Sequence, residues 1–317
     1  MLQQYSPIPG QFHTGHDHAT IYPFLQQSQD WTQSYANVDL TLDRKDRVFW
    51  CHLNPEDRPS VTPGLLRDVR TMQASMRERL AQTPEAERPF DFFVVASRTP
   101  GVFNLGGDLR LFAEAVRKQQ RLLLQTYAYG CVDIVHNNLT SYGQPIVTVA
   151  LVQGDALGGG FETALSCNVI IAERSAKFGL PEVLFNLFPG MGAYSLIARR
   201  LGAIEAERMI MSGKIYTAEE LHAKGLVDVL AEDGCGEQAL ADYVAQHRRR
   251  FNALQAVFQA RNRVSPVTLE ELRQVTDVWV DAALRLTPAD LRKMERLAAA
   301  QDRRCNIPAP GALVAAE

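Results

Sequence analysis

Two glutamates that follow glycine-containing segments are the residues of this chain most suited to acid–base chemistry. Glu162 ends the run ALGGGFE (156–162), and Glu182 ends the run FGLPE (178–182). Two carboxylates beside a polarised carbonyl group can exchange protons at adjacent carbons: one acts on the carbon α to the carbonyl, the other on a β-hydroxyl or a water. Either glutamate alone would more often be an ordinary surface residue, so the inference depends on the pair.

The glycines before Glu162 suggest a site that stabilises negative charge. They follow an apolar segment expected to be a buried strand, and a helix is expected to begin at about Phe161. Free N–H groups at a helix start favour a developing negative charge. The run lacks the GxGxxG pattern of dinucleotide-binding loops and the Gly-Lys-Ser/Thr of phosphate-binding loops. Taken alone, the segment is equally compatible with a tight packing turn.

A second segment, PGVFNLGGDL (100–109), has the same character. It also follows a buried strand and opens a helix, for which Asp108 is expected to be a start residue rather than a catalyst. Two such turns can place two backbone amides around one oxygen atom, which is an oxyanion hole for a thioester or ester carbonyl. The spacing between Glu162 and Glu182 covers a helix, a strand and a turn, which can bring the second carboxylate back towards the first.

The strands and helices expected around these residues indicate an α/β fold. Near-continuous apolar strands separated by helices indicate a sheet covered on both faces. Helices dominate after Gly190, where Thr217/Glu220 and Thr268/Glu271 predict capping boxes and Thr287-Pro288 predicts a helix start. The elements expected before that point are a hairpin over 38–42 and 47–53, a helix carrying Leu65 to Leu80, buried strands over 91–97, 145–153 and 168–172, and one helical stretch over 109–139.

Three regions are expected along the chain. Residues 1–34 form an irregular arm, in which His13, His16 and His18 read as part of a polar tail rather than as a metal site. Residues 35–235 form the α/β core, and residues 236–317 form a helical C-terminal region.

Composition excludes several classes of function. A formal net charge of −3 argues against a dedicated nucleic-acid binder, and the five cysteines form no CxxC pair, which argues against the usual zinc sites. We expect no metal and no cofactor. The N-terminal residues do not have the pattern of a signal peptide, and no apolar stretch is long enough to span a bilayer. A cytoplasmic protein without membrane insertion is therefore expected.

The three motif segments resemble the crotonase (enoyl-CoA hydratase) superfamily over about residues 90–235. The matching strings are ALGGGFE, FNLGGDL and FGLPEVLFNLFPGMGA. The resemblance implies a crotonase fold, a spiral of repeated ββα units with a helical C-terminal part, often assembled as a homotrimer. It implies an oxyanion hole made by the backbone N–H groups of Leu105 and Gly159. Because both hydratase glutamates are present, it favours hydration or dehydration, with Glu182 acting on the α-proton and Glu162 on the β-hydroxyl or water.

The string PGVFNLGGDL more closely resembles the diffusible-signal-factor synthases of bacteria. That resemblance implies dehydration of a 3-hydroxyacyl thioester on acyl carrier protein to a cis-2-enoyl product, followed by thioester hydrolysis that releases the free fatty acid. It implies an acyl pocket lined by Gly106, Leu157, Trp279 and Leu297. Since the chain has no GxSxG elbow, hydrolysis is expected to use water activated by the two glutamates.

Two alternatives to a signal synthase stay open at this stage. The first is an enoyl-CoA hydratase of fatty-acid catabolism, which would leave the thioester of its coenzyme A substrate intact. The second is a crotonase-fold regulatory protein that docks on the receiver domain of a sensor kinase. The intact glutamate pair argues against a purely non-catalytic role.

Overall fold

The computed structural model describes residues 31–305. The chain divides into two units, Met1–Trp31 and Thr32–Glu317, and every element described below belongs to the second. The histidines of the predicted N-terminal arm, His13, His16 and His18, lie outside the described residues.

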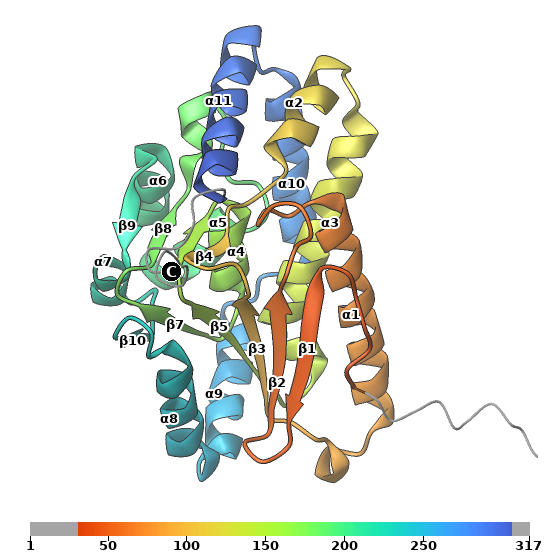
Figure 1. The fold of residues 1–317 in the computed structure, drawn as a ribbon, viewed down its shortest axis with the longest axis vertical. Coiled ribbons are helices and arrows are strands. Elements are labelled where there is room, and N and C mark those ends of the chain that lie inside the picture. The colour runs from red at the N-terminus through yellow and green to blue at the C-terminus, as the bar shows by residue number, and fades with distance from the viewer. Residues whose placement is uncertain (1–30, 306–317) are drawn as a thin grey trace, which may run out of the picture. The chain divides into compact units, whose positions relative to one another are not determined.

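A six-stranded sheet forms the base of the fold (Figure 1). Its first strand pairs antiparallel with the second, as the predicted hairpin requires, and the remaining neighbours pair in parallel. The inner strands consist mainly of buried apolar residues because helices cover both faces, with α8 (Gly236–Arg248) and α9 (Phe251–Val264) packed on one of them. In order across the sheet the strands are β1 (Val38–Asp43), β2 (Val48–Leu53), β3 (Phe92–Ser97), β5 (Val147–Val152), β7 (Val169–Glu173) and β10 (Val229–Ala231).

A four-stranded sheet carries the motif segments. Its strands, in spatial order, are β4 (Val102–Asn104), β6 (Asp155–Leu157), β8 (Lys177–Gly179) and β9 (Ile215–Thr217). The chain repeatedly places one strand in the large sheet, the next in the small sheet, and then a helix. Successive repeats therefore set β4, β6 and β8 side by side in parallel. Their carboxyl ends meet at one edge, which is where all three glycine-containing segments emerge.

Helices follow each pair of strands and make up the described part of the chain after residue 236. In that C-terminal part, α10 packs against α3 and α11 packs against α2. Among the residues described, no helix combines the length and apolarity needed to cross a membrane. The helices are α1 (Pro63–Gln82), η1 (Glu85–Glu87), α2 (Leu109–Arg117), α3 (Arg121–Leu139), η2 (Ser141–Gly143), α4 (Gly159–Ser166), η3 (Pro181–Phe185), α5 (Ala193–Leu201), α6 (Ala203–Ser212), α7 (Ala218–Ala223), α8 (Gly236–Arg248), α9 (Phe251–Val264), α10 (Leu269–Leu284) and α11 (Pro288–Cys305).

Local structure departs from the sequence prediction in three places. The single helix expected over 109–139 is wrong, because Gln119 adopts a left-handed conformation (φ 51°) and separates α2 from α3. The helix after the triple glycine begins at Gly159, two residues before the expected start. At Thr268 only half of the capping box forms, since the Glu271 carboxylate pairs with Arg199 instead.

The other two predicted helix starts are confirmed. At Thr217 both halves of the capping box with Glu220 are present. Thr287 precedes α11, which begins at Pro288.

Candidate active site

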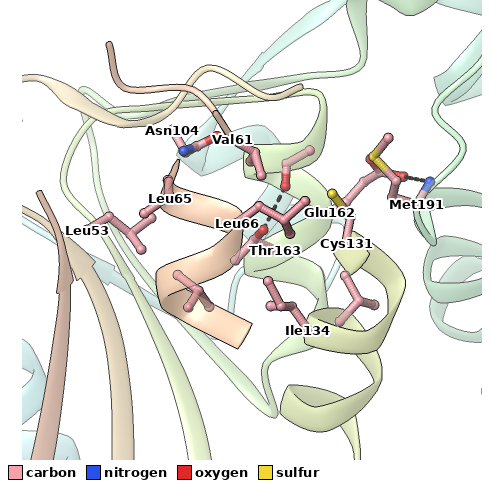
Figure 2. Close-up of a pocket in the computed structure, with 13 residues that line it drawn as sticks. Leu53, Val61, Leu65, Leu66, Asn104, Cys131, Ile134, Glu162, Thr163 and Met191 are labelled. Atoms are coloured by element: carbon pink, nitrogen blue, oxygen red, sulfur yellow. Dashed lines mark hydrogen bonds between the residues drawn. The ribbon is translucent and has the colours of Figure 1, made fainter. Parts of the chain in front are cut away.

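Glu162 lies in the first turn of α4, immediately after the end of β6, and is 1% exposed. Its Oε1 accepts hydrogen bonds from the backbone amides of Met191 (2.8 Å) and Ala193 (3.0 Å), as Figure 2 shows for Met191. Burial raises the pKa of Glu162 to about 7, and the two amides oppose that rise by stabilising the charged form. Glu162 is therefore poised to exchange a proton near neutral pH.

Glu182 lies in the first turn of η3, after the end of β8. Its Oε2 is buried and has no hydrogen-bond partner among the described residues. Burial, and after it the negative charge of Glu162, raise the pKa of Glu182 to about 8. Two neighbouring carboxyl groups that titrate near neutrality can divide the roles of acid and base between them.

Gly158 brings the two glutamates together. Its backbone has φ 50°, and its amide donates to the carbonyl of Gly179 at 2.8 Å, which links the ends of β6 and β8. A Cβ atom at Gly158 would lie 2.6 Å from Oε1 of Glu182. The glycine is needed here both for the left-handed backbone and for the space that the carboxyl group occupies.

The turns after β4 and β6 touch each other. A Cβ atom at Gly106 would lie 2.8 Å from the carbonyl oxygen of Leu157 and 3.0 Å from the amide nitrogen of Gly159. Gly159 is the first residue of α4, so its N–H has no acceptor within the helix. Of the two amides expected to form an oxyanion hole, that of Gly159 lies next to Gly106, and Gly159 lines the same cavity as Glu162.

The second expected amide, that of Leu105, is already bonded. It donates to the carbonyl oxygen of Pro59 at 2.7 Å, which the sequence did not suggest. The segment around Pro59 is held by an ion pair between Arg58 and Asp108 (2.7 Å) and by a hydrogen bond from Val61 to the carbonyl of Gly106 (2.7 Å). Leu105 can serve a substrate oxygen only when that oxygen replaces the carbonyl of Pro59.

Residues expected to line an acyl pocket are divided between two places. Gly106 and Leu157 lie at the touching turns, where Leu157 packs with Val102 and Leu105. Trp279 instead packs on the glycine that precedes Met191: a Cβ atom at Gly190 would lie 2.2 Å from its ring. The side chain therefore supports the loop that holds Glu162. Leu297 is half-buried on α11.

The supporting contacts of Glu162 and of the Leu105 turn were not predicted from the sequence. The amides of Met191 and Ala193 come from the segment FPGMGA, whose glycines were noted only as part of a resemblance. Gln301 of α11 donates to the carbonyl of Leu105 at 3.0 Å. These contacts join segments far apart in the chain, so spacing alone could not reveal them.

A mostly apolar cavity adjoins the site (Figure 2). It is a small space, and Gly159 and Glu162 are among the residues that line it. Side chains of α1 and α3 form most of its remaining wall.

Known proteins match this chain through its central part. A model of the enoyl-CoA hydratase/isomerase family matches residues 70–278. The chain is 38% identical over 133 residues to the 2,3-dehydroadipyl-CoA hydratase of Escherichia coli (strain K12), covering 42% of this chain and 51% of that protein. It is 28% identical over 201 residues to the mitochondrial methylglutaconyl-CoA hydratase of Rattus norvegicus, covering 62% of each chain. Both matches thus leave more than a third of the relative uncovered.

The fold is likewise similar to solved structures. An enoyl-CoA hydratase from Bacillus halodurans superposes with a TM-score of 0.68 at 22% identity, covering 82% of this chain and all of that one. The predicted crotonase fold is confirmed by this likeness. Since the family model matches about two thirds of the sequence and includes both candidate glutamates, this chain belongs to the enoyl-CoA hydratase/isomerase family.

Proposed function

We propose that this protein adds water to the Cα–Cβ double bond of a 2-enoyl thioester and catalyses the reverse dehydration of a 3-hydroxyacyl thioester. The observation that carries the proposal is the pair of carboxyl groups, with pKa values raised to about 7 and about 8, beside the first-turn amide of Gly159, which has no acceptor within α4. The hydratase names of the relatives support the same chemistry.

Each glutamate has a defined part in hydration. Glu162, with the lower pKa and two amides on Oε1, acts as the carboxylate that takes a proton from water as its oxygen bonds to the β-carbon. The electrons of the double bond move towards the thioester carbonyl, whose oxygen is stabilised by Gly159. Glu182, with the higher pKa, donates its proton to the α-carbon. Dehydration follows the same path with both proton transfers reversed.

The direct test is the loss of ultraviolet absorbance of a 2-enoyl-CoA as its conjugated double bond is hydrated. The matched variants are Glu162→Gln and Glu182→Gln, which keep the side-chain shape and remove the titrating group. We expect each to lower kcat by about 10²–10⁴-fold. A folded variant of either kind with wild-type turnover would rule out the proposed acid–base pair.

A second candidate is the synthesis of a cis-2-unsaturated fatty-acid signal, favoured by the resemblance of PGVFNLGGDL to the diffusible-signal-factor synthases. This activity would dehydrate a 3-hydroxyacyl group on acyl carrier protein. It would then hydrolyse the thioester: a water oxygen bonds to the acyl carbon, the C–S bond breaks, and the thiol leaves with a proton. A homotrimer and docking on a sensor-kinase receiver domain remain predictions tied to the same resemblances.

Product analysis separates the two candidates. After incubation with 3-hydroxydodecanoyl-acyl carrier protein, mass spectrometry of the product would show a free cis-2-enoic acid for a signal synthase. An enoyl group that stays on its carrier would support the hydratase alone. Repeating the incubation with the coenzyme A thioester tests which carrier is preferred.

A further inference from the structure

One of the two hydrogen bonds to Glu162 comes from the peptide unit that joins Gly190 to Met191. The Met191 N–H donates to Oε1 of Glu162 at 2.8 Å (Figure 2), and the carbonyl group of the same peptide unit is that of Gly190. A peptide unit is planar, so a contact that holds the Gly190 carbonyl also fixes the direction of the Met191 N–H. The residues around Gly190 therefore determine how well this hydrogen bond forms.

Two residues of α10 hold Gly190. The hydroxyl of the buried Thr276 lies 3.0 Å from the carbonyl oxygen of Gly190 and 2.8 Å from that of Leu272, so it can donate to either. Trp279, one turn later, packs so closely that a Cβ atom at Gly190 would lie 2.2 Å from its ring. Helix α10 thus contacts the peptide unit both at its carbonyl oxygen and at the Cα atom that precedes it.

Phe112 of α2 connects this contact to the turn after β4. Its ring lies 5.1 Å from that of Trp279, and a Cβ atom at Gly107 would lie 2.6 Å from it. The ring of Tyr127 packs edge-on against Phe112 at 5.1 Å, and its hydroxyl accepts from the amide of Asp108 at 3.3 Å. All three rings are at most 5% exposed. The loop that holds Glu162 and the turn that carries Leu105 therefore meet the same buried aromatic cluster, formed by Phe112, Tyr127 and Trp279.

These contacts bear on the ionisation of Glu162. Burial raises the pKa of Glu162 to about 7, and the amides of Met191 and Ala193 oppose that rise. A smaller side chain at Trp279 would leave space into which Gly190 can move, because close-packed interiors transmit such changes. The Met191 N–H would then turn away from the carboxylate, and burial would raise the pKa further.

We propose that Thr276 and Trp279 are positioning residues for Glu162, and that Phe112 ties their action to the turn at Gly107. The inference rests on the proposed function, since Glu162 is the carboxylate assigned there to water. It gives Trp279 a role that needs no contact with an acyl chain. A side chain that only lined an acyl pocket would alter substrate selection and leave the carboxyl group of the free enzyme unchanged.

The test follows the pKa of Glu162 by carboxyl-labelled ¹³C NMR, without substrate, in wild type, Thr276→Val and Trp279→Leu. We expect the pKa to rise by about 1 in each variant, as when one hydrogen bond to a charged group is weakened. Thr276→Ser keeps the hydroxyl and should restore the wild-type value. Phe49→Leu is the matched control, because it removes a buried ring from the large sheet and should leave the pKa of Glu162 unchanged. An unchanged pKa in both folded α10 variants would overturn the proposal.

Phe112→Leu tests the link between the two segments. If Phe112 acts on the loop through Trp279, this substitution should raise the pKa of Glu162 in the wild-type background and have a much smaller effect in Trp279→Leu. Equal effects in the two backgrounds would contradict the link. Among the described residues, the titratable side chains that face Glu162 are Glu182 and Cys131, and no variant changes either.

Two further measurements keep the result decisive. If Trp279→Leu does not fold, Trp279→Phe should move the pKa of Glu162 in the same direction, and no change would count against the proposal. In steady-state kinetics the acidic limb of the kcat/KM profile should move to higher pH in the α10 variants. A changed pKa in a protein that hydrates no enoyl thioester would keep the positioning role and reject the proposed function, so the two can fail separately.

Discussion

The backbone amide of Leu105 donates a hydrogen bond of 2.7 Å to the carbonyl oxygen of Pro59. A thioester oxygen that binds the same amide must displace that carbonyl, so binding requires the segment around Pro59 to move. The ion pair of Arg58 with Asp108, which is 4% exposed, opposes this movement.

Arg58→Ala should release the segment. Because a smaller fraction of molecules would then have the amide blocked, we expect KM for an enoyl thioester to fall by about 2–10-fold. The free energy of unfolding should fall by about 1–3 kcal/mol, since Asp108 loses its cationic partner. Steady-state kinetics and urea unfolding measure the two effects. The control is Arg98→Ala, which removes a more exposed ion pair to Asp39 at 3.6 Å. A KM equal to or above that of wild type would show that Pro59 does not block the amide.

Activity should have a bell-shaped dependence on pH. Turnover requires one carboxyl group ionised and the other protonated, and their pKa values are raised to about 7 for Glu162 and about 8 for Glu182. The maximum of kcat/KM should lie between these values. In Glu162→Gln the neighbouring negative charge is lost, so the pKa of Glu182 should fall, which carboxyl-labelled ¹³C NMR can follow. A pKa that stays unchanged in this variant would contradict the coupling of the two groups.

The free energy of unfolding should fall as pH rises, because of the same two carboxyl groups. Both folded-state pKa values exceed the ordinary value of 4.5, so the folded protein holds these protons more tightly than the unfolded chain. Their contribution to stability is therefore greatest below pH 4.5 and is lost as pH rises through 7 to 8. Glu182→Gln should be more stable than wild type at pH 9 by about 1–3 kcal/mol, with little difference at pH 5. Urea unfolding at both pH values measures this difference. If Glu182→Gln were more stable than wild type only at pH 5, the pKa of Glu182 would not be raised in the folded protein.

Gly158→Ala should abolish activity through sterics. The added Cβ would lie 2.6 Å from Oε1 of Glu182 and would push the carboxyl group out of the site. Gly101→Ala is a matched control, because Gly101 also has a positive φ (70°) but a Cβ atom added there would have nothing within 4 Å. Both variants should lose about 1–2 kcal/mol to backbone strain, measured by thermal unfolding. Equal kcat/KM in the two would show that the clash with Glu182 has no effect on catalysis.

The sequence was most informative where one strand and its following turn carry the relevant residues. Glu162, Glu182 and the glycines before them could be identified because each segment shows an apolar strand, a turn and a helix start within a few residues. Their meeting at one edge follows from the parallel order of β4, β6 and β8. The family resemblance implied only repeated ββα units, and the structure builds them by alternating strands between two sheets.

What escaped prediction depends on contacts between distant segments. The bond from Leu105 to Pro59 and the amides of Met191 and Ala193 on Glu162 have no local pattern. The break at Gln119 escaped because residues 117–121 (RKQQR) contain no glycine or proline to indicate a turn. The cavity between α1 and α3 is a property of packing, and apolar periodicity cannot distinguish a filled interface from a hollow one.

The hydrogen bond from Gln301 to the carbonyl of Leu105 has a consequence for the order in which the protein matures. Leu105 lies 196 residues earlier in the chain, so the turn that would hold a substrate oxygen gains this support only after α11 has docked. During synthesis both sheets can form before that helix leaves the ribosome. Catalytic competence would then be among the last properties that a newly made chain acquires.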